Sequence, residues 1–174
     1  MYKRILVPID GSHTSTLGLG EAIKLAKDQN AKLRLIHVVD ELILTGGPDG
    51  PADYSGNLLE SLQDGGKSIL RTAESRVQRN GLNSESVMLE HFGGQAASLI
   101  VEDAKKWKAD LIVLGTHGRR GIRRLVMGSD AEEIVRTSPV PVLLVRSKMP
   151  GKLVTRKRHR GVPKAKAPHT AGPK

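Results

Sequence analysis

The sequence predicts one α/β fold: a single doubly wound domain with a five-stranded parallel sheet of order 3-2-1-4-5 and helices on both faces. Short apolar runs alternate four times with longer segments of helical periodicity, and a final apolar run closes the series. Val, Ile, Leu and Ala supply the core, as buried parallel strands require, while aromatic residues make up only 2% of the 174 residues. Cysteine is absent, which excludes a disulfide scaffold, a zinc ribbon and thiol catalysis.

The first predicted strand is the apolar run from Ile5 to Ile9. Pro8 is acceptable in this run because it stands where strand pairing is already ending. Ser12 or Thr14 is expected to cap the following helix, which presents an apolar face and ends at Asn30. These signals predict a strand, a tight turn and a helix at the start of the domain.

A second strand is predicted over residues 32–39, followed by a long loop. Residues 40–56 include five Gly or Pro at positions 46–51, which favours a loop over a regular element. A long helix over about 58–79 comes next and ends at Asn80-Gly81.

The second half of the chain repeats the alternation and then closes it. Pro139 and Pro141 bracket the entry to the final strand. The remaining predicted elements are a strand over 86–91, a helix from Ala96 to Ala104, a strand over 111–114, a helix over 130–136 and a strand over 142–145.

The net charge of +10 is concentrated at the end of the chain. Residues 1–146 hold 19 Lys and Arg against 18 Asp and Glu, whereas residues 147–174 hold nine Lys and Arg and no acid. We therefore expect a folded domain over 1–146 and a basic, disordered tail over 147–174. No apolar stretch reaches the roughly 18 residues of a membrane span, and no signal region precedes the first strand, so a soluble, cytoplasmic protein is expected.

Ligands of doubly wound sheets bind beyond the carboxyl ends of the strands, where the strand order reverses. In the predicted order this reversal lies between the first and fourth strands. These two strands lead into Asp10-Gly11 and Gly115-Thr116. The candidate site is therefore expected where these two segments meet.

The segment after the fourth strand, residues 115–129, is rich in glycine and arginine and is called the glycine loop below. Gly115 and Gly118 allow the main chain to approach a ligand closely. Gly128 and Ser129 begin a helix, whose free amides and positive dipole end favour an anion. Arginine guanidinium groups suited to phosphate occur at Arg119, Arg120, Arg123 and Arg124.

The glycine loop fits the pattern G-x2-G-x9-G-[S/T] through Gly115, Gly118, Gly128 and Ser129. A Walker loop is excluded because no lysine follows Gly128, and the dinucleotide pattern G-x-G-x-x-G is missing after the first strand. The chain also opens with I-L-V-P-I-D-G-S and closes its domain with P-V-P-V-L-L-V-R. With these three motifs, residues 2–146 resemble the universal stress protein family.

The resemblance implies a dimeric stress-response regulator that binds ATP, or ADP or AMP, at the switch point of the sheet. In the family, the aspartate that closes the first strand contacts the nucleoside, the end of the second strand lines the adenine pocket, and the glycine loop holds ribose and phosphates. Dimers commonly form through the last strand, here Val140, Val142 and Leu144. The residues expected at the nucleotide are Pro8, Ile9, Asp10, Val38, Val39, Gly115, Thr116, Gly118, Arg119, Gly128, Ser129, Asp130 and Ala131.

One departure from the family concerns the residues after Gly128-Ser129. Family members often have an apolar residue there, whereas this chain has Asp130. Its carboxylate suits the positive end of the helix dipole when no ligand is bound there, but it repels a triphosphate. The sequence therefore predicts weak ATP binding or a preference for AMP or ADP. Ser129 and Glu132 also fit a capping box.

Other interpretations stay open from sequence. The glycines could serve only as turns between helix and sheet, and Asp10 could be a turn residue, a helix cap or a magnesium ligand through ATP. His117 is interpreted as a solvated loop residue, because no serine-and-acid constellation accompanies it. No general base or nucleophile is evident near the glycine loop, so the only enzymatic activity expected of this chain is, at most, slow hydrolysis of ATP. The alternative function is an interaction protein whose basic tail binds nucleic acid or an anionic surface.

Overall fold

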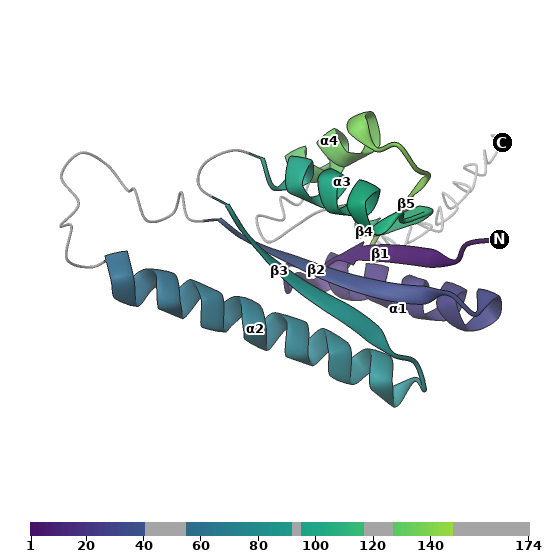
Figure 1. Ribbon diagram of the computed structural model, residues 1–174, viewed down its shortest axis with the longest axis horizontal. Coiled ribbons are helices and arrows are strands. Elements are labelled where there is room, and N and C mark those ends of the chain that lie inside the picture. The colour runs from purple at the N-terminus through teal and green to yellow at the C-terminus, as the bar shows by residue number, and fades with distance from the viewer. Residues whose placement is uncertain (41–54, 92–94, 117–126, 148–174) are drawn as a thin grey trace, which may run out of the picture.

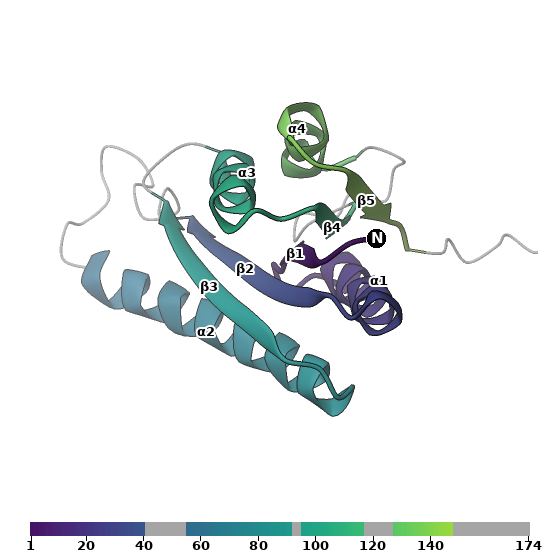
Figure 2. The ribbon, with the colours of Figure 1, turned by 45° about the vertical axis from the view of Figure 1, so that its right-hand side comes forward.

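The computed structural model describes residues 1–40, 55–91, 95–116 and 127–147. A five-stranded parallel sheet lies between two pairs of helices, α1 and α2 on one face and α3 and α4 on the other (Figure 1 and Figure 2). The strand order β3-β2-β1-β4-β5 confirms the predicted fold. The elements are β1 (Arg4–Pro8), α1 (His13–Gln29), β2 (Lys32–Asp40), α2 (Ser55–Arg79), β3 (Ser84–His91), α3 (Ala96–Trp107), β4 (Leu111–Gly115), α4 (Ser129–Thr137) and β5 (Val142–Val145).

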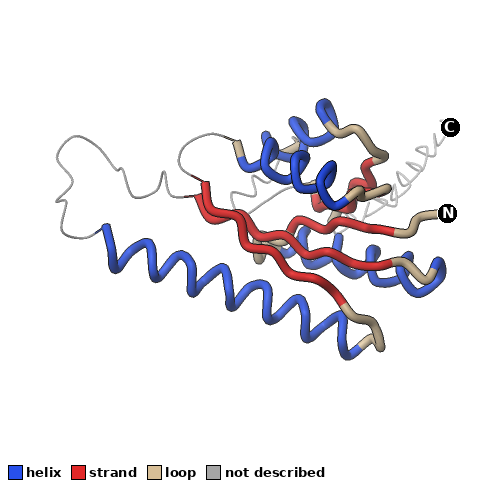
Figure 3. Tube along the Cα trace, in the orientation of Figure 1, coloured by secondary structure: helices blue, strands red, loops and turns tan. Residues whose placement is uncertain are grey.

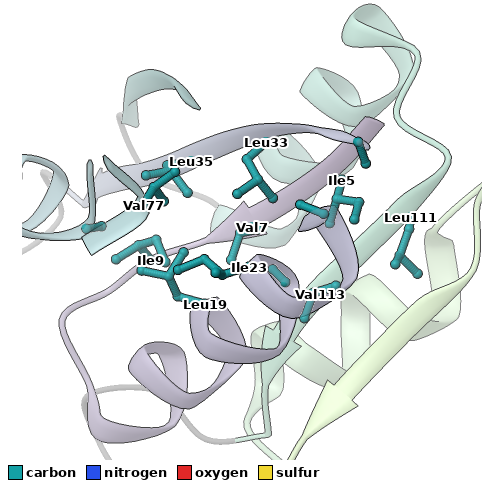
Figure 4. Close-up of a cluster of buried hydrophobic side chains, with 14 of the residues drawn as sticks. Ile5, Val7, Ile9, Leu19, Ile23, Leu33, Leu35, Val77, Leu111 and Val113 are labelled. Atoms are coloured by element: carbon teal, nitrogen blue, oxygen red, sulfur yellow. The ribbon is translucent and has the colours of Figure 1, made fainter. Parts of the chain in front are cut away.

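The central strand β1 is buried on both faces. Ile5, Leu6 and Val7 are each 0% exposed. Strand alternation sends Ile5 and Val7 into the core beneath α1 and α2, which Figure 4 shows in close-up. Leu6 packs in the second core, beneath α3 and α4. Helices on both faces thus explain why this strand is a continuous apolar run.

The helix α1 begins and ends at the residues that the sequence indicates. The Ser12 hydroxyl accepts a hydrogen bond from the Ser15 amide at 3.1 Å, so Ser12 is the cap and Thr14 lies inside the helix. Asn30 adopts the left-handed conformation with φ of 53°, and its amide donates to the Ala26 carbonyl.

Some boundaries differ from the predicted ones. Strand β3 begins at Ser84, two residues before the predicted start, because its pairing with β2 continues from Leu33 opposite Ser84 to Asp40 opposite His91. Strand β1, by contrast, pairs with β2 only as far as Pro8 opposite Ile36. As a result β2 and β3 continue side by side past the end of β1 (Figure 3). The carboxyl edge of the sheet therefore has a step beside β1.

Candidate functional site

The predicted site lies at the carboxyl edge, where the strand order reverses between β1 and β4. These strands pair in parallel, with Ile5 opposite Leu111 and Leu6 opposite Ile112. Their carboxyl ends therefore lie next to each other, as the site prediction requires. The turn after β1, the end of β4 and the beginning of α4 meet at this point.

The turn after β1 forms the first wall of the site. The Asp10 carboxylate accepts a hydrogen bond from the Ser12 amide at 2.9 Å, and Gly11 has a φ of +79°, which favours glycine. Asp10 is therefore a turn residue, one of the roles left open by the sequence. Because Asp10 is only half-buried, a turn role is compatible with contact to a ligand.

The end of β4 forms the second wall and lies unusually close to α1. A Cβ atom on Gly115 would lie 2.6 Å from the Thr14 carbonyl carbon and 2.7 Å from its oxygen. A Cβ atom on Gly18 would lie 3.3 Å from the Gly115 nitrogen. Gly115 is thus required for packing of α1 against the sheet, independently of any ligand.

The base of the glycine loop is closed by main-chain hydrogen bonds. The Thr116 amide donates to the Val145 carbonyl at 3.0 Å, and the Thr116 carbonyl accepts from the Gly128 amide at 3.0 Å. Gly118 and Arg119 lie outside the described residues, as do His117 and the arginines at 120, 123 and 124. The structure therefore describes the two ends of the loop, at 115–116 and 127–129.

The beginning of α4 forms the third wall. Gly128 is the cap and makes no side-chain capping bond, while Ser129 is the first helical residue. The capping box of Ser129 and Glu132 is therefore wrong, because Ser129 lies one position too far into the helix to act as the cap. Asp130 is exposed in the first helical turn, and Ala131 is buried.

The predicted site residues divide between the two faces of the sheet. Val38 packs in the core beneath α3 and α4 together with Ala131, and alternation from Leu6 places Pro8 on the same face. Ile9 packs in the opposite core, beneath α1 and α2. Val39 follows Val38 on the strand, so its side chain faces the core beneath α1 and α2, as that of Ile9 does. Only the main chain of Val39 can then line the nucleotide side of the edge.

Sequence reasoning missed two neighbours of the site. Met127 packs in the core beneath α3 and α4, beside the predicted residues, and its position directly before Gly128 was the signal that could have found it. Thr14 lies against Gly115 and is 8% exposed. A polar residue in the first turn after the Asp10 turn could have indicated this contact.

The two pKa shifts that the structure shows belong to an ion pair on α3, away from this edge. The Lys106 ammonium, 2.7 Å from Glu102, lowers the pKa of that carboxyl through a hydrogen bond and its charge, and Glu102 raises the pKa of Lys106 in return. Both residues lie in the second half of α3, which leads back to the amino edge of the sheet. Within the described residues, no group of three or more His, Asp or Glu side chains forms a metal site.

The last strand, β5, forms one edge of the sheet. Val142 and Leu144, predicted at a dimer interface, are partly buried against the core beneath α3 and α4, and so is Val140. Leu143 on β5 is 38% exposed, and Val135 on α4 is 44% exposed. In the described part of the chain, no helix has the length and apolar character needed to cross a membrane.

The fold and its carboxyl edge define a doubly wound α/β protein with a glycine loop at the switch point. The family model of the universal stress proteins matches residues 1–146, and the chain belongs to this family. It is similar to universal stress protein MJ0531 of Methanocaldococcus jannaschii, with 38% identity over 147 residues, 84% of this chain and 83% of that protein.

Two solved structures illustrate the likeness in three dimensions. Universal stress protein UspA from Lactobacillus plantarum is 28% identical, with a TM-score of 0.71 over 83% of this chain and 98% of that one. A universal stress protein in complex with cAMP is also 28% identical, with a TM-score of 0.58 over 83% of this chain and 96% of that one.

Proposed function

We propose that the chain binds an adenine nucleotide at the carboxyl edge between β1 and β4, and that it acts as a dimeric regulator in the stress response. The observation that carries the proposal is the convergence of the Asp10 turn, the Gly115-Thr116 segment and the beginning of α4 at the switch point. The similarity to a universal stress protein in complex with cAMP supports adenine as the base.

The two faces of the edge suggest how the nucleotide would lie. Val38 and Met127 pack on the face beneath α3 and α4, and strand alternation places Pro8 on the same face, so the three would offer apolar surface for the base. The phosphates would then extend toward the glycine loop, where the first amides of α4 favour an anion. Arg119 in the glycine loop would neutralise phosphate charge, and Asp10 would contact the nucleoside.

Asp130 would set the preference among nucleotides. Its carboxylate is exposed in the first turn of α4, where phosphates would approach. Like charges repel more strongly as phosphates are added, so AMP, ADP or cAMP would bind more tightly than ATP. The Asp130→Asn substitution should then strengthen ATP binding more than AMP binding.

Isothermal titration with ATP, ADP, AMP and cAMP, each with and without Mg²⁺, tests the proposal directly. Measurable affinity for at least one of the four, at a stoichiometry of one per chain, is expected. Absence of binding by all four at millimolar concentration would refute the nucleotide proposal. A benefit of Mg²⁺ for ATP alone would indicate that the ion enters with the triphosphate.

The Asp10→Ala substitution should weaken nucleotide binding while the protein stays folded. It removes both a nucleoside contact and the 2.9 Å bond that holds the turn, and affinity should fall by about tenfold. Asp28→Ala, at an exposed position near the end of α1, is the matched control and should bind as the wild type does. Equal affinities for the two variants would show that the site is misplaced.

Dimerisation through β5 can be measured by sedimentation equilibrium. The exposed Leu143 on this edge strand supports an apolar contact through β5. The Leu143→Lys substitution should shift the protein toward monomer, whereas Lys24→Ala on the exposed surface of α1 should not. A wild-type protein that stays monomeric at high micromolar concentration would refute this part of the proposal.

A second function is favoured by the charge of residues 147–174, which hold nine basic residues and no acid. We propose nucleic acid as the partner of this tail, in a contact that weakens with rising salt. Comparison of the full chain with a 1–146 truncation for DNA and RNA binding tests this function. Salt-independent binding, or binding that survives truncation, contradicts it. Phosphate release from ATP by the same samples tests for slow hydrolysis.

A further inference from the structure

The strand β2 carries a buried histidine that lies directly behind the candidate site. His37 is 5% exposed, and its Nδ1 atom lies 2.6 Å from the carbonyl oxygen of Ile9. A carbonyl oxygen can only accept, so Nδ1 carries the proton and donates it to Ile9. The neighbouring Val38 faces α3 and α4, so His37 faces α2, on the side away from the proposed nucleotide.

This hydrogen bond lies at the point where β1 leaves β2. The last paired residues of the two strands are Pro8 and Ile36, and the Ile9 amide still donates to the Ile36 carbonyl at 2.7 Å. The Ile9 carbonyl receives the His37 side chain. Ile9 is thus held at both of its main-chain polar groups, directly before Asp10.

The helix α2 holds the imidazole from behind. A Cβ atom on Gly66 would lie 2.7 Å from Cδ2 of His37, 3.2 Å from its Nε2 and 3.1 Å from Sδ of Met88. Only glycine at this position leaves room for the ring. The adjacent Gly65 is different, because a Cβ atom there would meet nothing within 4 Å. The ring is therefore confined between Gly66 of α2 and the end of β1.

We propose that His37 is a positioning residue of the nucleotide site. By fixing the Ile9 carbonyl, it sets the plane of the Ile9–Asp10 peptide and hence the direction of the Asp10 carboxylate. It acts from the opposite face of the sheet and touches no nucleotide itself. This inference rests on the proposed function, in which Asp10 contacts the nucleoside.

Substitutions at position 37 separate hydrogen bonding from packing. His37→Leu fills the space without a donor, and AMP affinity, measured by isothermal titration, should fall about tenfold, as for a lost oriented contact. In His37→Asn the amide nitrogen stands as many bonds from Cα as Nδ1 does, so it should restore most of the affinity. A purely structural role would give no such rescue, because asparagine packs less well than leucine.

The adjacent glycines provide a matched pair. Gly66→Ala pushes a methyl group against the imidazole and should weaken AMP binding, whereas Gly65→Ala should leave it unchanged. Both variants make the same change in the same helix, so helix propensity cannot explain a difference between them. If His37→Leu or Gly66→Ala binds AMP as tightly as the wild type, the inference is overturned.

A measurement without nucleotide distinguishes this inference from the proposed function. The Ser12 amide is hydrogen-bonded to Asp10 in the turn, so its hydrogen exchange reports the order of the turn. His37→Leu should speed this exchange and His37→Asn should leave it near the wild-type rate. If the wild type binds no AMP, the proposed function fails, and the exchange rates still decide whether His37 positions the turn. An unchanged Ser12 rate in His37→Leu overturns the inference.

Discussion

Substitution of Gly115 by alanine tests whether the first glycine of the loop pattern is needed for packing. The added Cβ atom would lie 2.6 Å from the carbonyl carbon of Thr14, 2.7 Å from its oxygen and 2.8 Å from its Cβ. The first two atoms belong to the main chain of α1, and the third is bonded directly to it. None lies at the flexible end of a side chain, so rotation of a side chain cannot relieve the clash. The φ angle of Gly115 is not positive, so the cost of the substitution is steric.

The size of the effect follows from the displacement needed. Ordinary contact begins at 3.4 Å, so α1 and β4 must separate by about 0.8 Å. A Cβ atom on Gly18, one turn further along α1, would lie 3.3 Å from the Gly115 nitrogen, so the next turn of the helix is also close to β4 and a simple tilt of α1 would not relieve the clash. Overpacking costs about 1–3 kcal/mol, and a clash between two main-chain segments belongs at the upper end. We expect a loss of about 3 kcal/mol from a total of roughly 5–15 kcal/mol.

Urea unfolding followed by far-UV circular dichroism, without nucleotide, measures this loss. Gly65→Ala is the control, because its Cβ meets nothing within 4 Å and alanine favours the helix by up to about 1 kcal/mol. Gly115→Ala should unfold at much lower urea than the wild type, and Gly65→Ala at equal or higher urea. A Gly115→Ala midpoint equal to that of the wild type would refute the packing role, and Gly115 would then be needed only for ligand binding.

Three further predictions concern residues outside the site. The Ser86 hydroxyl is buried without a hydrogen-bond partner among the described residues, so Ser86→Ala should raise stability by about 1 kcal/mol in urea unfolding; a loss would show that the hydroxyl is satisfied. The Arg34 guanidinium lies 3.1 Å from both Asp103 carboxylate oxygens, and the two side chains are only 18% and 14% exposed. Arg34→Met should therefore lower the free energy of unfolding by about 3 kcal/mol in urea unfolding, because it leaves the Asp103 carboxylate unpaired, and the additional substitution Asp103→Asn should reduce this loss. Glu102 should titrate below its ordinary pKa of 4.5 in a carbon-detected NMR titration, and this lowering should disappear in Lys106→Met. The attraction between the Glu102 carboxylate and the Lys106 ammonium is fully present above pH 4.5 and is lost as the pH falls through the lowered pKa of Glu102.

The fold could be predicted from sequence because its signals are local. An apolar run such as Ile5 to Ile9 fits only a strand covered on both faces, and Ser12 and Asn30 mark the two ends of α1 through their own side-chain and main-chain conformations. The start of β3 at Ser84 was missed because it depends on pairing with Leu33 on another strand. The capping box at Ser129 was wrong because a one-residue shift in the helix start moves the hydroxyl out of the capping position.

The candidate site divides in the same way. Its place at the switch point follows from strand order, and the residues that come directly after β1 and β4 follow from the sequence once that order is known. By itself, the sequence thus determined the α/β class, the strand order and the segments that meet at the edge, because hydrophobic periodicity and glycine positions are read along the chain. Only the tertiary structure decided that Gly115 must accommodate Thr14, that Val38 and Ile9 face opposite cores, and that His37 holds the Ile9 carbonyl. These are contacts between residues distant in sequence, and their distances depend on how the elements pack.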